Sequence, residues 1–410
     1  MKRPIAEIKV GLDFGSEILP VGRLAIRDHI IYFEYQASFI QKRLEISPIR
    51  MPLRSGVTAF DRSPFEGLAG VFSDSLPDGW GRLLFDRLLR SQNMLPSDIT
   101  PLDRLAHVGF HGMGALVYEP DYSPSDTDGL IDLDHLAEQA EKVLRGSSEE
   151  IIQELLALNG SSAGARPKAL IGVDKTRQII FHGAKQLAPG FEPWLVKFPN
   201  SQDGSDAGAI EYVYALMAKE AGVAMPDVHL FTARQGRGYF AVKRFDRDGT
   251  KRYHMHTAGG LLHSNFRTPS LDYEDLLTLT GELTKDIREV EKIYRLAIFN
   301  VLAHNRDDHA KNFSFLMDEK GEWKLSPAYD LTFSNGPGGE QSTTVMGEGR
   351  NPGDTLLRKL GLEAGLSKAF IEDSIVKTRF ALGRWKPLAK EYDINPSTIS
   401  LIGKRLASSE

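Results

Sequence analysis

Charged residues gather in one short stretch of the chain, 305–312, which reads Asn-Arg-Asp-Asp-His-Ala-Lys-Asn. The runs on either side, 294–303 and 313–317, are largely apolar and have the character of core segments. Charged side chains between core segments are unfavourable to bury unless they pair with one another or hold a metal ion. The stretch could simply be a solvated surface loop, but the spacing of Asp307 and Asn312 favours a catalytic loop.

Asp307 and Asn312 are separated by four residues, as in the Asp-x-x-x-x-Asn loops that support phosphoryl transfer. Such a site needs a base for the acceptor hydroxyl, oxygen ligands for magnesium and a cation for the phosphates. Asp307 can be the base, and Asn312 offers the hard oxygen that Mg²⁺ prefers. A second metal ligand is predicted at Asp330, because the segment 323–332 is expected to return as a strand antiparallel to 313–317. The predicted cofactors are therefore ATP and Mg²⁺.

Two other residues of the stretch, Lys311 and His309, are candidate catalytic residues. Lys311 can neutralise the transferred phosphoryl group, or it can simply pair with Asp307. His309 can hold the loop by a hydrogen bond, and a metal-ligand role is disfavoured because magnesium prefers oxygen. Asp308 receives no role from the sequence.

A lysine in an upstream strand is a candidate for contacting the phosphates of ATP. Lys197 lies within the apolar run 191–198, where it either snorkels to solvent or pairs with phosphate. Glu211 lies near the start of the predicted helix 210–222. It can pair with Lys197, or it can be a first-turn acid that the helix dipole stabilises.

A loop of small residues, Ser161-Ser-Ala-Gly-Ala-Arg-Pro-Lys, leads into the apolar run 169–173. It is neither a Walker A motif nor a G-x-G-x-x-G motif, and small residues before a strand usually form a turn. The alternative is a loop that covers phosphates. That interpretation assigns cofactor binding to Ser162, Ala163, Gly164 and Lys168.

The elements that must position these residues are predicted from the apolar patterns. Residues 5–60 are β-rich, with a hairpin around Arg27-Asp28, whereas the composition becomes helical beyond a strand at 238–247. In a two-lobed ATP enzyme the connection between lobes follows such a strand. The predicted helices lie at 79–90, capped by Asp78 or Gly79, at 133–158, at 285–303 and, as two or three helices, over 363–407, and a Gly-rich loop is predicted at 335–355.

The composition is that of an ordinary globular protein, with 410 residues, 41% hydrophobic and 26% charged. Cysteine is absent, which excludes disulfides, thiolate metal sites and a cysteine nucleophile. The net charge of −5 gives no support to a large basic surface for nucleic acid. The N-terminus has no signal-peptide pattern and no run is long and apolar enough to span a bilayer, so we expect a cytoplasmic protein with no membrane partner.

Several of these segments together resemble a known family. The stretch 305–312, Tyr329-Asp-Leu-Thr, the loop 161–168 and Ala241-Val-Lys-Arg-Phe-Asp-Arg occur in the order and approximate spacing of HipA-type toxins. The likeness extends to Leu76-Pro-Asp-Gly-Trp and covers nearly the whole chain. HipA-type toxins are serine/threonine kinases of bacterial toxin–antitoxin pairs.

The resemblance implies an α+β, two-lobed, protein-kinase-like fold related to that of lipid kinases. We divide the chain into a β-rich N-terminal subdomain (1–125), the rest of the N-lobe (126–245) and a helical C-lobe (246–410). The resemblance also implies that Ser161 is autophosphorylated, with Ser162 as the neighbouring alternative. The connection Lys243-Arg244-Phe245 would receive adenine, although Lys243 stands where the family archetype has an acidic residue.

The resemblance further implies a helix-turn-helix antitoxin of the HipB type, operator DNA reached through it, and an aminoacyl-tRNA synthetase as protein substrate. Two alternatives stay open at this point. One is a small-molecule or lipid kinase that uses the same site, and the other is a kinase-fold co-repressor that acts only with its DNA-binding antitoxin.

Overall fold

The computed structural model describes residues 5–124, 129–146, 149–159, 164–182, 187, 189–200, 204–265, 268 and 270–407. Its N-terminal region is built on an antiparallel sheet with the strand order β4-β3-β2-β1-β5. The strands are β1 (Glu7–Asp13), β2 (Ile18–Arg27), β3 (Ile30–Tyr35), β4 (Val57–Ala59) and β5 (Leu116–Glu119). The predicted hairpin joins β2 to β3 through Asp28 and His29, whose φ values of 52° and 62° are typical of a tight two-residue turn.

A second five-stranded sheet lies in the middle of the chain, with the order β7-β6-β8-β10-β9. Its strands are β6 (Lys168–Asp174), β7 (Ile180–His182), β8 (Phe191–Lys197), β9 (Val228–Phe231) and β10 (Tyr239–Lys243). The helix α7 (Ala207–Glu220) packs on β9 and β10. The predicted strand and helix that carry Lys197 and Glu211 are therefore both present.

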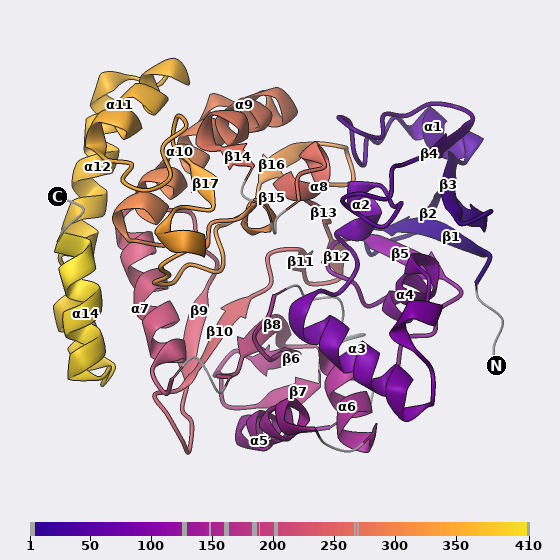
Figure 1. Ribbon diagram of the computed structural model, residues 1–410, viewed down its shortest axis with the longest axis horizontal. Helices are drawn as coiled ribbons and strands as arrows, with labels where there is room; N and C mark the ends of the chain where they lie inside the picture. The colour runs from indigo at the N-terminus through magenta and orange to yellow at the C-terminus, as the bar shows by residue number, and fades with distance from the viewer. Residues whose placement is uncertain are drawn as a thin grey trace.

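The helix α3 (Gly79–Ser91) belongs to the core of the second sheet, although it precedes that sheet by some distance in the chain. Its Trp80 and Leu84 are buried in one apolar cluster with Trp194 and Val196 of β8. Figure 1 shows α3 beside α6 (Glu149–Asn159). A segment from the N-terminal region thus reaches the part of the fold that holds the candidate phosphate-binding residues.

The single helix predicted over 133–158 is wrong, because the structure has two helices there, α5 (Leu133–Arg145) and α6. Gly146 ends α5 in a left-handed conformation with φ of 111°, and its N–H bonds to the carbonyl of Val143. Glycine adopts this helix-ending conformation without the steric penalty of a Cβ.

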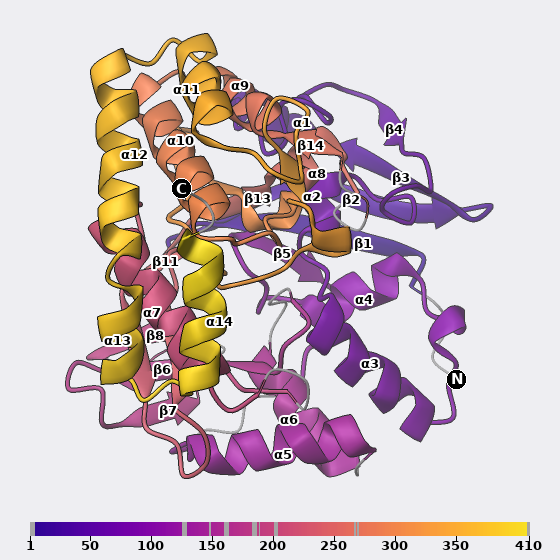
Figure 2. The same ribbon diagram turned by 60° about the vertical axis from the view of Figure 1, so that its left-hand side comes forward.

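The C-terminal region is helical, as predicted, with a small antiparallel sheet, β13-β15-β16, next to the candidate catalytic stretch. Figures 1 and 2 show α12 and α14 on the side of the molecule away from the N-terminal sheet, and Figure 2 shows α13 there as well. The main elements are β13 (His254–Thr257), α9 (Tyr273–Thr284), α10 (Ile287–Leu302), β15 (Ser314–Met317), β16 (Trp323–Leu325), α11 (Asp354–Glu363), α12 (Lys368–Leu382), α13 (Trp385–Glu391) and α14 (Pro396–Ala407).

The strand predicted over 323–332 is shorter than expected. β16 pairs antiparallel with β15 but ends at Leu325, and Asp330 has a left-handed φ of 59° that no strand residue adopts. The remaining short elements are α1 (Ala37–Lys42), α2 (Gly70–Ser73), a 3-10 turn at Pro96–Asp98, α4 (Pro101–Val108), β11 (Arg247–Asp248), β12 (Lys251–Arg252), α8 (Ala258–Leu262), β14 (Leu271–Asp272), η2 (Ala310–Asn312), η3 (Pro337–Gly339) and β17 (Thr343–Thr344). Within the described ranges, no helix has the length and apolarity that crossing a bilayer requires.

Candidate active site

A cavity of about 420 Å³ lies between the second sheet and the C-terminal helical region. This volume is within the range of small-ligand sites. The predicted site residues that line it are Gly164, Lys168, Lys197, Lys243, Arg244, Phe245, Asp307, His309, Lys311, Asn312 and Asp330. The other predicted residues, Ser161, Ser162 and Ala163, lie outside the residues that the structure describes.

Lys197, the last residue of β8, is held between two carboxylates. Its Nζ lies 2.5 Å from Oε1 of Glu211 and 2.6 Å from Oδ1 of Asp330. Burial opposes the charge of Lys197, but the two carboxylates outweigh it and raise the pKa of the ammonium. Glu211 is buried and lies past the first turn of α7, so the structure shows the pairing alternative and not the helix-dipole alternative.

Lys168 is the direct partner of Lys197 in the antiparallel pairing of β6 with β8. Residues opposite each other on adjacent strands place their side chains on the same face, and both lysines line the cavity. Burial, together with the neighbouring charge of Lys197, lowers the pKa of Lys168 to about 8. Two ammonium groups side by side in one cavity suit an anion with several charges, such as a polyphosphate.

Asp330 sits in a backbone conformation that is rare for residues other than glycine, with φ of 59°. The Lys197 ammonium holds the pKa of the Asp330 carboxyl well below its usual range, so the group is ionised at neutral pH. The segment is anchored by the preceding Tyr329, whose hydroxyl donates to the carbonyl of Lys311 at 2.6 Å. These contacts bring Asp330 to the predicted catalytic stretch without a strand.

Asp307 is exposed and lines the cavity. Partial removal from water and the nearby Asp330 carboxylate raise the pKa of Asp307, although His309 and Arg166 act to lower it. Asn312 ends the one-turn helix η2, and its Nδ2 donates to the carbonyl of Asp307 at 2.8 Å. This bond closes the loop between the two residues. It also leaves the amide Oδ1 of Asn312 as the atom available to a cation.

Asp308, which the sequence left without a role, is the structural anchor of the loop. Its buried carboxylate accepts hydrogen bonds from the Tyr273 hydroxyl (2.7 Å), from Nε2 of Gln341 (3.0 Å) and from the backbone N–H groups of Ser342 (3.0 Å) and Thr343 (3.2 Å). Burial raises the pKa of this carboxyl to about 7. The Gly-rich region predicted as a loop at 335–355 is thus tied to the catalytic stretch, which no local pattern indicated.

Lys311 forms its ion pair with Asp78, whose Oδ2 lies 2.9 Å from Nζ. The sequence predicts Asp78 only as a helix cap, and it gives pairing with Asp307 as one of two possible roles for Lys311. The sequence holds no local signal for this contact, because the two residues are 233 positions apart.

The connection 243–245 contributes to the cavity wall but its polar side chains are paired elsewhere. Lys243 lies 2.6 Å from Glu192, and Arg244 forms two hydrogen bonds with the buried carboxylate of Asp246. Phe245 packs on Tyr329 with ring centroids 5.5 Å apart. A nucleobase here would therefore meet apolar surface and backbone groups.

The oxygen donors of the cavity fit magnesium better than a tightly bound transition metal. In the part of the chain that the structure describes, no group of three or more His, Cys, Asp or Glu side chains could hold a metal ion by itself. Magnesium is often held by one or two carboxylates together with substrate phosphates. Asp330 and Asn312 offer such an incomplete set of hard ligands.

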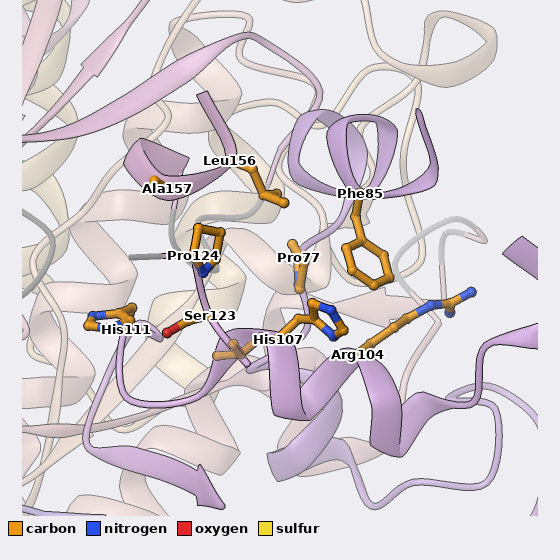
Figure 3. Close-up of a pocket in the computed structure, with 10 residues that line it drawn as sticks. Pro77, Phe85, Arg104, His107, His111, Ser123, Pro124, Leu156 and Ala157 are labelled. Carbon is orange, nitrogen blue, oxygen red and sulfur yellow. The ribbon is translucent and has the colours of Figure 1, made fainter. Parts of the chain in front are cut away.

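A second, much smaller cavity lies between α3, α4 and α6 and contains no predicted site residue (Figure 3). Its volume of about 30 Å³ admits only one or two waters. His107 projects toward Phe85 in this view, with ring centroids 4.7 Å apart, and its Nδ1 is hydrogen-bonded to the carbonyl of Asp103 at 2.8 Å. These contacts describe a packed junction of helices.

Known proteins include relatives of this chain. The chain is similar to "Putative kinase Y4dM" of Sinorhizobium fredii (29% identical over 151 residues, 34% of this chain and 36% of that protein). It is also similar to "Putative kinase Y4mE" of the same organism (28% over 259 residues, 57% of each chain). The matches thus span less than two thirds of these relatives.

Among solved structures, the chain resembles HipA from Shewanella oneidensis MR-1 in its complex with HipB and operator DNA. The TM-score is 0.68 with 16% identity, over 98% of this chain and 96% of that one. At this identity the likeness is one of fold. Family models of the HipA N-terminal domain and of the HipA-like C-terminal domain match residues 16–119 and 160–385. The chain therefore belongs to the HipA family.

Proposed function

We propose that this chain is an ATP- and Mg²⁺-dependent kinase that phosphorylates serine or threonine in a protein and acts as the toxin of a toxin–antitoxin pair. The observation that carries the proposal is the ion-pair triplet of Lys197 with Glu211 and Asp330, beside Asp307 and Asn312 in one cavity. This is the set of parts that phosphoryl transfer requires.

Each residue has a distinct task in this proposal. Lys197 and Lys168 neutralise the phosphates, and Glu211 keeps the Lys197 side chain in place. Asp330 and Asn312 would hold magnesium, which when bound neutralises charge on the transferred group. Asp307 accepts the proton of the attacking hydroxyl, and its raised pKa makes it a better base than an ordinary aspartate.

The proposed partners rest on the family and on the structure of a relative. The related HipA was solved with HipB and operator DNA, so we infer a HipB-like helix-turn-helix antitoxin for this chain and operator DNA bound through it. An aminoacyl-tRNA synthetase is the proposed substrate, and Ser161 is the proposed autophosphorylation site. A phosphate there would add about −1.5 to −2 charge three positions before Gly164 in the chain and would inhibit the enzyme.

The decisive experiment compares the wild type with Asp307→Asn and Asp330→Ala in labelled-ATP transfer with magnesium present. We expect the wild type to transfer labelled phosphate to protein and both variants to lose this transfer. Asp307→Asn should still bind an ATP analogue. Label found only in small molecules would instead support a small-molecule or lipid kinase. If the wild type neither hydrolyses ATP nor phosphorylates itself, the proposal that this chain is an enzyme is refuted. The kinase-fold co-repressor would then be the remaining alternative.

Phosphoproteomics after induction, again against Asp307→Asn, identifies the substrate. Mass spectrometry of active preparations tests the modification at Ser161 or Ser162. Absence of phosphate from both serines would remove autophosphorylation from the proposal without affecting the kinase assignment.

A further inference from the structure

The residue before α3 links two parts of the candidate active site that are distant from it in the chain. Asp78 occupies the N-cap position of α3, but its side chain makes no capping hydrogen bond. Its Oδ1 accepts the backbone N–H of Gly164, and its Oδ2 pairs with Lys311 Nζ at 2.9 Å. An N-cap aspartate ordinarily bonds the first turn of its own helix, so this carboxylate is used to join other segments.

The position of Asp78 is fixed by contacts that do not involve its own side chain. The backbone N–H of Trp80 donates to the carbonyl of Gly164 at 3.0 Å, and the Trp80 side chain is 1% exposed. Gly79 has a φ of +44°, and a Cβ there would meet the Gly164 carbonyl. A change confined to the Asp78 side chain should therefore leave α3 in place.

The Asp78–Lys311 pair is shielded from water. The two side chains are 14% and 11% exposed, and charges so shielded interact more strongly than surface pairs. Burial alone would raise the pKa of Asp78, but Lys311, the Gly164 N–H and Lys168 outweigh it and lower the pKa. The carboxylate is ionised at neutral pH and acts on two lysines that line the cavity.

We propose that Asp78 is a positioning residue for phosphoryl transfer, holding the Lys311 ammonium and the Gly164 backbone in a fixed relation at the phosphate end of the cavity. It acts through Lys311 and does not touch the reacting atoms. The inference rests on the proposed kinase function and extends that site to the N-terminal region of the chain. Its consequence is specific. Loss of the Asp78 charge makes the cavity more positive, so ATP is still bound, while the orientation of Lys311 in the transition state is lost.

The test is Asp78→Asn, which keeps an oxygen for the Gly164 N–H and removes the charge that faces Lys311. We expect kcat to fall about 10- to 100-fold, the effect of losing one hydrogen bond to a charged group, with KM for ATP unchanged or lower. The matched control is Asp373→Asn, which breaks an exposed Asp–Lys pair of 2.8 Å on α12 and should leave both constants unchanged. A rise in KM with unaltered kcat would overturn the proposal.

The dependence on Lys311 is tested with Lys311→Met and the double variant. If Asp78 acts through Lys311, Asp78→Asn causes no further loss in the Lys311→Met background, whereas multiplying effects would show an independent role. A merely structural defect would instead lower the unfolding midpoint and affect both backgrounds.

A readout without catalysis separates this proposal from the proposed function. We expect Asp78→Ala to accelerate hydrogen exchange in peptides covering 164–168 and 307–313, with exchange in α3 itself unchanged. Equal exchange in wild type and variant would refute the positioning role even in an active enzyme. Faster exchange in Asp78→Ala, together with a wild type that itself transfers no phosphate, would uphold the contact and reject the kinase assignment.

Discussion

The buried carboxyl of Asp308 predicts how the free energy of unfolding changes with pH. Its pKa is raised from 3.8 to about 7, so the folded protein holds this proton over a pH range in which the unfolded chain has lost it. Stability from this group is therefore highest at low pH, falls as pH rises toward 7 and is constant above it. One pKa unit corresponds to about 1.4 kcal/mol, so the free energy of unfolding should lose about 3 kcal/mol between pH 5 and pH 8 through Asp308 alone.

The perturbation is Asp308→Asn, which cannot titrate but keeps one oxygen for the N–H groups of Ser342 and Thr343. We expect the difference in unfolding free energy between wild type and variant to change by about 3 kcal/mol from pH 5 to pH 8, the wild type losing its advantage as pH rises.

The assay is denaturant unfolding at several pH values, with Asp373→Asn, an exposed aspartate on α12, as the control that should follow the wild type. Parallel pH profiles for wild type and Asp308→Asn would refute the reasoning. They would mean that the carboxylate is ionised when folded, stabilised by its four hydrogen bonds more than it is penalised by burial.

Two further predictions concern the phosphate end of the cavity. Because the pKa of Lys168 is lowered to about 8, binding of an ATP analogue should weaken from pH 7 to pH 9 in the wild type but not in Lys168→Arg, which stays charged. Calorimetric titration at both pH values checks this, and an equal decline in the two proteins would contradict it. Gly79→Ala should lower the free energy of unfolding by about 1–3 kcal/mol through its clash with Gly164. Gly249→Ala, where φ is also positive but no neighbour lies within 4 Å, is the control, and equal unfolding midpoints would argue against the close approach.

Local spacing predicted part of the geometry of the candidate site. Asp307 and Asn312 lie on one short loop, and the hydrogen bond between them needs only the intervening residues to turn. The strand that carries Lys197 and the helix that carries Glu211 are likewise present. They could be predicted because apolar periodicity over a few residues is enough to indicate such elements. Sequence could not choose between the two roles of Glu211, since that choice depends on how α7 packs against β8.

Two predictions about secondary structure were wrong, each for its own reason. The strand predicted to reach Asp330 ends earlier. Asp330 has a left-handed backbone, and its side chain contacts Lys197 while the neighbouring Tyr329 bonds to Lys311. The break between α5 and α6 was missed because Gly146 is tolerated within a helical pattern, although its conformation here ends the helix.

By itself, the sequence determined which chemical groups are available and which of them lie together on one loop, because spacing along a chain fixes local geometry. It also carried enough motif order to indicate the family. Tertiary structure alone decided that Asp78 meets Lys311 and Gly164, and that Asp308 is held by residues 341–343. Contacts between distant segments depend on which apolar faces pack together, as α3 does with β8, and no spacing between residues encodes that choice.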